Sequence, residues 1–302
     1  MEGLQENIER LKKERRAVIL AHYYVADEVK ALADYTGDSY YLAKLASNTD
    51  ADTIVFCGVH FMGESAKLLN PQKKVLLPEP MADCPMAHMA GIEQIERLRA
   101  EVPDLAVVCY INSTAELKAH CDVCVTSSNA LKIVRALKNK NILFIPDENL
   151  GHYVAEQVPE KNFYFSGGFC HVHANVTADS VRSLLAAHPQ AEVLAHPECK
   201  KDVLALAHFA GSTADMIARV KESGAKEMIV CTEGGVLFEM KSAAPDKAFY
   251  VPGGRLCCPN MKKITPEKVC RCLETGEGEV MLNEHMAQRA AMPLKAMLEL
   301  AR

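Results

Sequence analysis

No apolar run in the 302-residue sequence reaches the roughly 18 residues that a bilayer-spanning helix needs. Positive charge is not in excess either. The formal net charge is −5 and the isoelectric point about 6.1, which argues against a general surface for nucleic acid or acidic membrane. The N-terminal stretch MEGLQENIERLKKERR is a charged helical pattern that lacks the apolar segment of a secretory signal. We therefore expect a cytoplasmic protein that binds neither nucleic acid nor membrane.

Cysteine, by contrast, is abundant, with twelve residues in the chain. In the cytosol these thiols should mostly stay reduced, which leaves core packing, metal binding and redox chemistry as their roles. The chain is long enough for two or three compact units with a large buried core. The places of the cysteines within those units therefore decide between the roles.

The sequence contains three similar copies of one pattern, in which short apolar strands alternate with helical stretches. Tyr110 lies 88 residues after His22, and His196 lies a further 86 residues on. The first strands are ILAHYY (19–24), VVCYIN (107–112) and VLAHPE (193–198), and helices start after them at GDSYYLAK (37–44), TSSNALK (126–132) and GSTADMI (211–217). The later strands are TIVFCG (53–58), NILFIP (141–146) and EMIVCT (227–232), then VLLPEP (75–80), FYFSGG (163–168) and FYVPGG (within 248–254).

Such alternation of helices with short apolar strands predicts parallel sheets covered by helices on both faces. The predicted fold class is α/β, with three similar three-layer domains. If these domains pack about a pseudo-threefold axis, they enclose one central active-site cavity. The predicted domains are 1–88, 89–175 and 176–262, and the remaining residues 263–302 form C-terminal helices at 265–275 and 284–301.

One cysteine follows the third strand pattern of each copy: Cys84 in ADCPMA, Cys170 in GGFCHVH and Cys258 in CPNM. About a threefold axis their thiolates would converge. Three thiolates do not complete a structural zinc site, but they suit a [4Fe–4S] cluster whose fourth iron stays open as a Lewis acid. The alternative is three unrelated loop cysteines. Cys257 competes for the third position, and the match of CPNM to CPMA near a helix start favours Cys258.

The other cysteines carry weaker signals. Three lie inside strand patterns, where small core residues are expected: Cys57, Cys109 and Cys231. Cys121 and Cys124 form a CxxC, for which zinc or thioredoxin-like chemistry is the alternative to a structural role, although no second pair matches it. The rest are Cys199, which opens a helix, and Cys270 and Cys272, expected as surface thiols of a C-terminal helix.

Each first strand ends in two polar residues spaced i, i+2, so that their side chains face the same way. A single one is more often structural, but parallel sheets bind ligands beyond the carboxyl ends of their strands, and six in register predict one polar cavity. They are His22, Tyr24, Tyr110, Asn112, His196 and Glu198. Glu198 is the only acid among them and therefore the candidate general acid/base.

The predicted helix starts add the hydroxyls of Ser39, Ser127, Ser212 and Thr213. Each is a plausible N-cap, which alone would explain it, and three helix N-termini facing one axis would also hold carboxylates or a phosphate. His171 and His173, close after Cys170, could flank the cluster or simply be solvated.

Taken together, these segments resemble the quinolinate synthase family over nearly the whole chain. The motifs that carry the resemblance are AHYY, GDS, ADCPMA, CYINS, VTSSNA, GGFCHVH, AHPEC, GST and CPNM, in family order and spacing. The resemblance implies three α/β domains about a pseudo-threefold axis and one [4Fe–4S] cluster per chain at the bottom of a central cavity. It also implies the de novo NAD biosynthetic reaction that condenses iminoaspartate with dihydroxyacetone phosphate to quinolinate, phosphate and two waters.

Matching motifs imply roles for individual residues. The cluster ligands would be Cys84, Cys170 and Cys258, with one iron open. Catalysis would fall to Glu198, assisted by Tyr24 and His22. Substrate binding would involve His22, Ser39, Tyr110, Asn112, Ser127, His173, His196, Glu198, Ser212 and Thr213. Functional coupling to L-aspartate oxidase, which makes the unstable imine, is expected by analogy.

This sequence departs from some family members, which carry a CxxCxxC arrangement near the third ligand. Here the adjacent pair Cys257 and Cys258 stands instead, which puts in doubt any disulfide switch of those relatives. Two other functions fit parts of the pattern. One is a cluster-dependent hydro-lyase acting on a hydroxy acid. The other is a thiol- or zinc-based binding or regulatory protein, which would be colourless and contain zinc.

Overall fold

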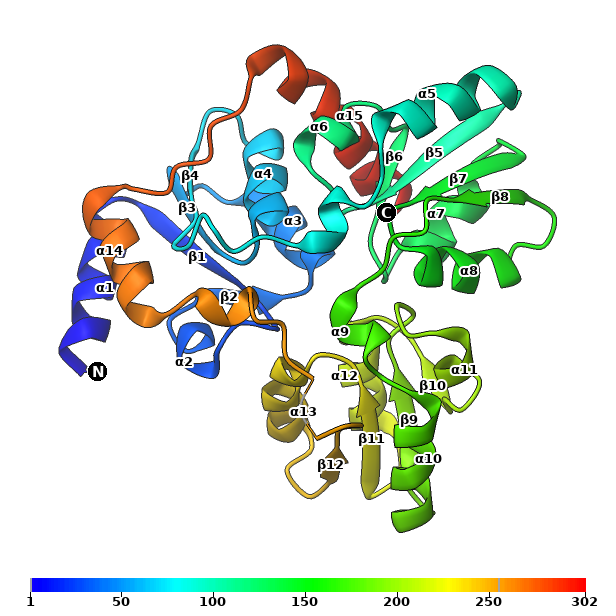
Figure 1. The fold of residues 1–302 in the computed structure, drawn as a ribbon. Coiled ribbons are helices and arrows are strands. Elements are labelled where there is room, and N and C mark those ends of the chain that lie inside the picture. Colours follow the sequence, from blue (N-terminus) through cyan, green and yellow to red (C-terminus); the bar gives the residue numbers. More distant parts are fainter. Residues whose placement is uncertain (1, 255) are drawn as a thin grey trace.

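In the computed structural model, which describes residues 2–254 and 256–302, three four-stranded sheets form three lobes around a common centre (Figure 1). The strands pair in parallel within every sheet. The strand orders are β2-β1-β3-β4, β6-β5-β7-β8 and β10-β9-β11-β12, so each lobe repeats one topology. The predicted α/β class with three similar units is confirmed.

The first lobe holds strands β1 (Ala17–His22), β2 (Tyr35–Gly37), β3 (Thr53–Cys57) and β4 (Lys74–Leu76). Its helices are α1 (Glu2–Glu14), α2 (Asp27–Lys30), α3 (Ser39–Asn48) and α4 (His60–Leu69). Every residue of β3 is buried, because helices cover both faces of a parallel sheet.

The second lobe holds β5 (Leu105–Tyr110), β6 (Val123–Val125), β7 (Asn141–Ile145) and β8 (Asn162–Phe165). Its helices are the 3₁₀ turn η1 (Pro85–His88), α5 (Ile92–Glu101), α6 (Ala115–Lys118), α7 (Ala130–Ala136), α8 (Glu148–Glu156) and α9 (His171–Ala174). As in the first lobe, the central strand β5 is buried along its whole length.

The third lobe holds β9 (Glu192–Ala195), β10 (Phe209–Ala210), β11 (Glu227–Cys231) and β12 (Ala248–Tyr250). Its helices are α10 (Ala178–Ala187), α11 (Lys201–Leu204), α12 (Thr213–Glu222), η2 (Gly234–Val236), α13 (Leu237–Ala243) and η3 (Met261–Lys263). The strands of each sheet fall within the predicted ranges 1–88, 89–175 and 176–262, whose boundaries stay predictions.

The sequence patterns identified three strands per lobe, whereas each sheet has four. The additional strands are β2, β6 and β10, which are only two or three residues long and lie at a sheet edge. A strand this short shows no alternation, and the edge of a sheet does not demand an apolar run.

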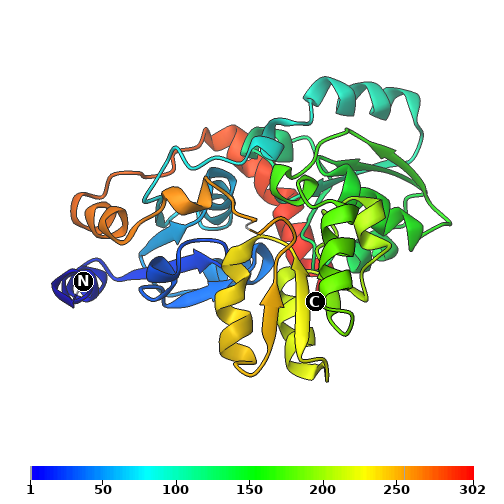
Figure 2. The same cartoon turned by 60° about the horizontal axis from the view of Figure 1, so that its bottom comes forward.

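The C-terminal helices α14 (Pro266–Thr275) and α15 (Glu284–Leu300) lie close to their predicted places. Helix α14 packs against α1 and β3, and α15 packs against α4 of the first lobe and α6 and β6 of the second. In Figure 2 this red helix runs between the two lobes. The expectation that Cys270 and Cys272 are surface thiols is wrong, because this packing buries both.

The buried apolar residues divide unevenly between the lobes. One continuous core joins the first two lobes with α14 and α15, whereas the third lobe holds two smaller cores of its own. Among the described residues, no helix combines the length and the apolar character that a membrane crossing requires.

Candidate active site

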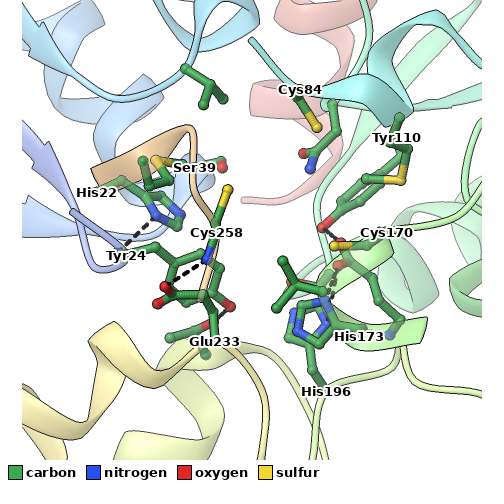
Figure 3. Close-up of a pocket in the computed structure, with 18 of the residues that line it drawn as sticks. His22, Tyr24, Ser39, Cys84, Tyr110, Cys170, His173, His196, Glu233 and Cys258 are labelled. Atoms are coloured by element: carbon green, nitrogen blue, oxygen red, sulfur yellow. Dashed lines mark hydrogen bonds and ion pairs between the residues drawn. The ribbon is translucent and has the colours of Figure 1, made fainter. Parts of the chain in front are cut away.

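The three lobes meet at a cavity that holds about 780 Å³ of space outside protein atoms, counting its open mouth. Every predicted site residue except Ser212 lines it, and Figure 3 shows the arrangement. The lining residues that were predicted are His22, Tyr24, Ser39, Cys84, Tyr110, Asn112, Ser127, Cys170, His173, His196, Glu198, Thr213 and Cys258.

Cys84, Cys170 and Cys258, called here the cavity trio, each stand before a short helix or turn. Cys84 precedes η1 with Pro85 at its first position, as predicted, and Cys170 precedes α9. Cys258 differs, because Pro259 lies in a turn and η3 begins only at Met261. Figure 3 shows the three sulfur atoms on different sides of one cavity.

The same two backbone amides face the sulfur in each member of the cavity trio, those of the residues two and three positions later. They belong to Met86 and Ala87, to Val172 and His173, and to Asn260 and Met261. Burial nevertheless raises the pKa of the Cys84 thiol to about 12, with Cys258 and Glu198 adding to the rise. Burial also raises the pKa of the Cys170 and Cys258 thiols.

Cys257, the competitor for the third position, lies elsewhere. It lines a separate groove with Ala26, Gly234 and Lys262, whereas Cys258 lines the cavity. The position of the side chains is therefore consistent with the predicted preference for Cys258.

His22 and His196 occupy equivalent places and are fixed in the same way. The amide of Tyr24 donates to Nδ1 of His22 at 3.2 Å, and the amide of Glu198 donates to Nδ1 of His196 at 3.2 Å. Burial lowers the pKa of each imidazole to about 3, so both are neutral at neutral pH. Because Nδ1 accepts, the proton of each ring is on Nε2, which makes both rings hydrogen-bond donors.

Glu198 is buried between three partners. Its Oε1 accepts from the Tyr110 hydroxyl at 2.5 Å, and its Oε2 lies 2.6 Å from Nδ1 of His173 and 3.9 Å from Nδ1 of His196. Burial opposes the charged form, but the adjacent His173 and the hydrogen bond from Tyr110 outweigh it and lower the pKa of Glu198 to about 2. The group is therefore a carboxylate at neutral pH.

Thr232 connects this group to the first lobe, and the sequence patterns did not identify it. Its hydroxyl lies 2.8 Å from Nε2 of His173 and 3.0 Å from the Tyr24 hydroxyl, which also contacts Thr213 Oγ1 at 2.8 Å. A His173 tautomer with its proton on Nδ1 would accept from Thr232 at Nε2, and the Thr232 oxygen would then accept from Tyr24. Polar contacts thus run from Tyr24 through Thr232 and His173 to Glu198, and the last of them is the 2.6 Å approach of His173 Nδ1 to Oε2.

The predicted N-caps are only partly correct. Ser212 caps α12 by accepting from the Asp215 amide at 3.2 Å, and it does not line the cavity. Asp38, whose carboxylate is an equally good cap, takes that place on α3 and leaves Ser39 as the first helical residue. The residue before α7 is Asn129, two positions after Ser127. The hydroxyls of Ser39 and Ser127 line the cavity instead.

The CxxC cysteines belong to a second group, Cys109, Cys121 and Cys124, called here the interior trio. Cys109 and Cys124 are register partners on β5 and β6, and both are fully buried. Burial opposes ionisation of Cys109, but hydrogen bonds from the other two thiols and the charge of buried Lys118 lower its pKa well below the ordinary value. All three thiols are free.

Within residues 2–254 and 256–302, one set of side-chain atoms lies close enough together to hold a single metal ion, and it is not the cavity trio. A sulfur of Cys170, a nitrogen of His173 and an oxygen of Glu198 all lie within 4.8 Å of one another. This set could hold a single metal ion, but it takes one sulfur of the cavity trio and leaves Cys84 and Cys258 unused.

Comparison with known proteins is consistent with the resemblance. The family described as quinolinate synthetase A protein matches residues 6–299. The chain is 47% identical over 298 residues to quinolinate synthase of Clostridioides difficile, covering 99% of this chain and 98% of that protein. It is 49% identical over 298 residues to quinolinate synthase of Fusobacterium nucleatum, covering 99% of each. For quinolinate synthase 2 of Methanosarcina acetivorans the identity is 43% over 298 residues, covering 99% and 96%.

Proposed function

The chain belongs to the quinolinate synthetase A protein family, and from this premise we propose that it condenses iminoaspartate with dihydroxyacetone phosphate. The products would be quinolinate, phosphate and two waters, in de novo NAD biosynthesis. One observation supports the proposal above all: three cysteines, one from each repeat, line the same cavity as the buried carboxylate of Glu198. We further propose a cytoplasmic location and functional coupling to the L-aspartate oxidase that supplies the imine.

The donor set fits a [4Fe–4S] cluster. Thiolates are the ligands such clusters take, and three thiolates hold three irons. In each case two backbone amides face the sulfur, which favours the thiolate form. Cys84, Cys170 and Cys258 would hold the cluster. When bound, it supplies an iron with an open position that acts as a Lewis acid.

The substrates carry carboxylates and a phosphate, which the cavity would bind without many cations. Among the residues that the structure describes, no lysine or arginine lines the cavity. We propose that the hydroxyls of Ser39, Ser127 and Thr213, with the amides at the starts of α3 and α12, hold these anionic groups. Asn112 and the Nε2–H groups of His22 and His196 would orient the remaining polar atoms.

Proton movement would centre on Glu198. As a carboxylate it can accept a proton from the substrate at Oε1 or Oε2; the hydrogen bond from Tyr110 fixes Oε1, and the His173 ring lies 2.6 Å from Oε2. The path through Thr232 to Tyr24 would return a proton on the opposite side of the cavity. Because the product ring is aromatic, the protein mainly has to orient reactive intermediates and exclude water.

Substitution of Glu198 tests the proton role. We expect Glu198→Gln to lower the rate of quinolinate formation, measured without oxygen, by about 100-fold or more, since general acid–base catalysis contributes about 10²–10⁴-fold. Iron content, measured on the same sample, is the control and should stay unchanged. Near-normal turnover would remove Glu198 from the central role.

Elemental analysis tests the cofactor. Protein purified without oxygen should be brown and contain about four irons and four sulfides per chain, with bleaching in air. Zinc at one atom per chain with little iron would instead support a single-metal site at Cys170, His173 and Glu198. Assays with hydroxy acids as alternative substrates separate the proposed condensation from a hydro-lyase reaction.

A further inference from the structure

The loops that carry the cavity trio are attached to the three sheets by one repeated backbone hydrogen bond. The amide of His60 donates to the Ala82 carbonyl at 2.7 Å, that of Glu148 to Gly168 at 2.8 Å, and that of Gly234 to Leu256 at 2.7 Å. Each acceptor lies two residues before the cysteine of its lobe. Each donor amide belongs to the second residue after the second strand pattern of its repeat (53–58, 141–146 or 227–232), and one residue separates it from that pattern. The separating positions are Val59, Asp147 and Glu233, which are therefore structurally equivalent.

In two lobes this position holds a carboxylate that also binds the amide of the cysteine itself. Asp147 accepts from the Cys170 amide at 3.2 Å through Oδ2 and from the Leu150 amide at 2.8 Å through Oδ1. The Asp147 carboxylate thereby joins the loop that carries Cys170 to the first turn of α8. Asp147 is 0% exposed, so water does not compete for either oxygen.

Glu233 makes the same pair of contacts in the third lobe. It accepts from the Cys258 amide at 3.1 Å through Oε1 and from the Gly235 amide at 2.6 Å through Oε2, and it is 1% exposed. The ammonium of Lys262 lies 3.4 Å from Oε1 and donates to the Tyr24 carbonyl at 2.6 Å. Glu233 therefore also connects the Cys258 loop to the first lobe.

The first lobe uses another arrangement. The side chain of Val59 cannot accept a hydrogen bond, and the Cys84 amide instead donates to the side chain of its neighbour Asp83 at 2.7 Å. The Asp83 side chain is 48% exposed and paired with exposed His88 at 2.7 Å. Water can replace an exposed acceptor at little cost, whereas a buried amide that loses its acceptor has no water to take its place.

From these contacts we propose that Asp147 and Glu233 are positioning residues that hold Cys170 and Cys258 in place for the iron–sulfur cluster. The inference rests on the proposed function, because it concerns retention of that cluster. A carboxylate fixed by two amides sets the direction of the cysteine backbone, and groups that orient ligands in this way control metal affinity. The Cys84 loop, held by an exposed carboxylate, should depend less on its acceptor.

Amide substitutions test this with little change of shape. Asp147→Asn and Glu233→Gln keep one acceptor oxygen but place an NH₂ group against the second backbone amide. We expect each to release iron to a chelator about 10- to 100-fold faster than the unchanged holoenzyme, the usual effect of removing an outer-shell partner. The electron paramagnetic resonance spectrum of the reduced cluster should also change, which a purely structural role would not produce.

Glu64→Gln is the matched control. Glu64 is likewise a buried carboxylate that accepts a backbone amide, that of Ala115 at 2.9 Å, and within the described residues no hydrogen bond or ion pair joins it to a cysteine loop. Its variant should lose iron at the rate of the unchanged protein. Asp83→Asn should raise the rate no more than about threefold, because water replaces the exposed acceptor.

The possible results distinguish failure of the proposed function from failure of the positioning role alone. If the unchanged protein binds no iron after anaerobic reconstitution, the proposed function itself is wrong. If it binds iron, and Asp147→Asn and Glu233→Gln retain iron and spectrum like Glu64→Gln, only the positioning role is wrong. Thermal unfolding of the apoproteins tests whether the two variants lose iron only because the protein itself is less stable. If both variants destabilise the apoprotein well beyond Glu64→Gln, the two carboxylates are general structural residues and the inference is overturned.

Discussion

The cavity trio takes one cysteine from each lobe, whereas the interior trio takes all three from the second lobe. Members of the cavity trio lie 86 and 88 residues apart, and each sulfur faces backbone amides. Members of the interior trio lie on neighbouring strands and in the turn before β6, and their sulfurs satisfy one another with help from Lys118. The cysteines that are close in sequence, the interior trio, therefore contact one another inside the second lobe. The cysteines that are far apart in sequence, the cavity trio, point into the open cavity.

Replacing a single cysteine of the cavity trio should give the largest loss of iron and activity among the predictions made here. We expect Cys84→Ser, Cys170→Ser and Cys258→Ser each to lose most of the iron and to lower quinolinate formation at least 100-fold, because two thiolates do not hold the cluster. Cys257→Ser is the neighbour control and should keep both. Iron, sulfide and rate are measured on the same anaerobic samples, and a normal iron content in any of the three variants would break the comparison.

Thr232 gives an intermediate effect on the cavity side. Thr232→Val keeps the shape but removes the hydroxyl between Tyr24 and His173, so we expect kcat to fall about tenfold with iron content unchanged. Thr232→Ser should restore most of the rate, because it restores the hydroxyl. Equal rates for valine and serine would show that the hydroxyl carries no proton.

Changes in the interior trio should affect stability rather than chemistry. Cys109→Ala removes a fully buried sulfur from the interior trio and leaves a small cavity, so we expect the free energy of unfolding to fall by about 1–3 kcal/mol. Iron content and quinolinate formation should stay within about twofold of the unchanged protein, since removing a buried partner acts mainly on stability. Urea unfolding of the apoprotein provides the first measurement. Loss of iron in this variant would mean that the two trios are not independent.

The sequence repeats predicted much of this molecule because the lobes share strand lengths and strand ends. The offsets placed His22, Tyr110 and His196 at equivalent positions, and all three line the cavity. The offsets could not reveal Asp147 and Glu233, because the equivalent residue in the first lobe is Val59. A search for polar residues at the ends of the second strands would have found both.

Two other features of the structure depend on contacts between segments that are far apart in the sequence, so no local sequence pattern predicts them. The pairing of Cys109 with the CxxC follows from the register of β5 against β6, which spacing along the chain does not determine. Thr232 lies between Tyr24 and His173 only after the first lobe, the third lobe and α9 have packed together. Residues of this kind are recognised from geometry.

The uneven division of the apolar core has a mechanical consequence. The first two lobes share one core with α14 and α15, while contacts between the first and third lobes include the hydroxyls of Tyr24 and Thr213 and the ammonium of Lys30 with the Gly235 carbonyl. Water can replace such polar contacts one by one, but it cannot replace buried apolar surface without a large loss of free energy. We therefore expect the cavity to open along the seam with the third lobe, because parting the first two lobes would expose the larger shared apolar core.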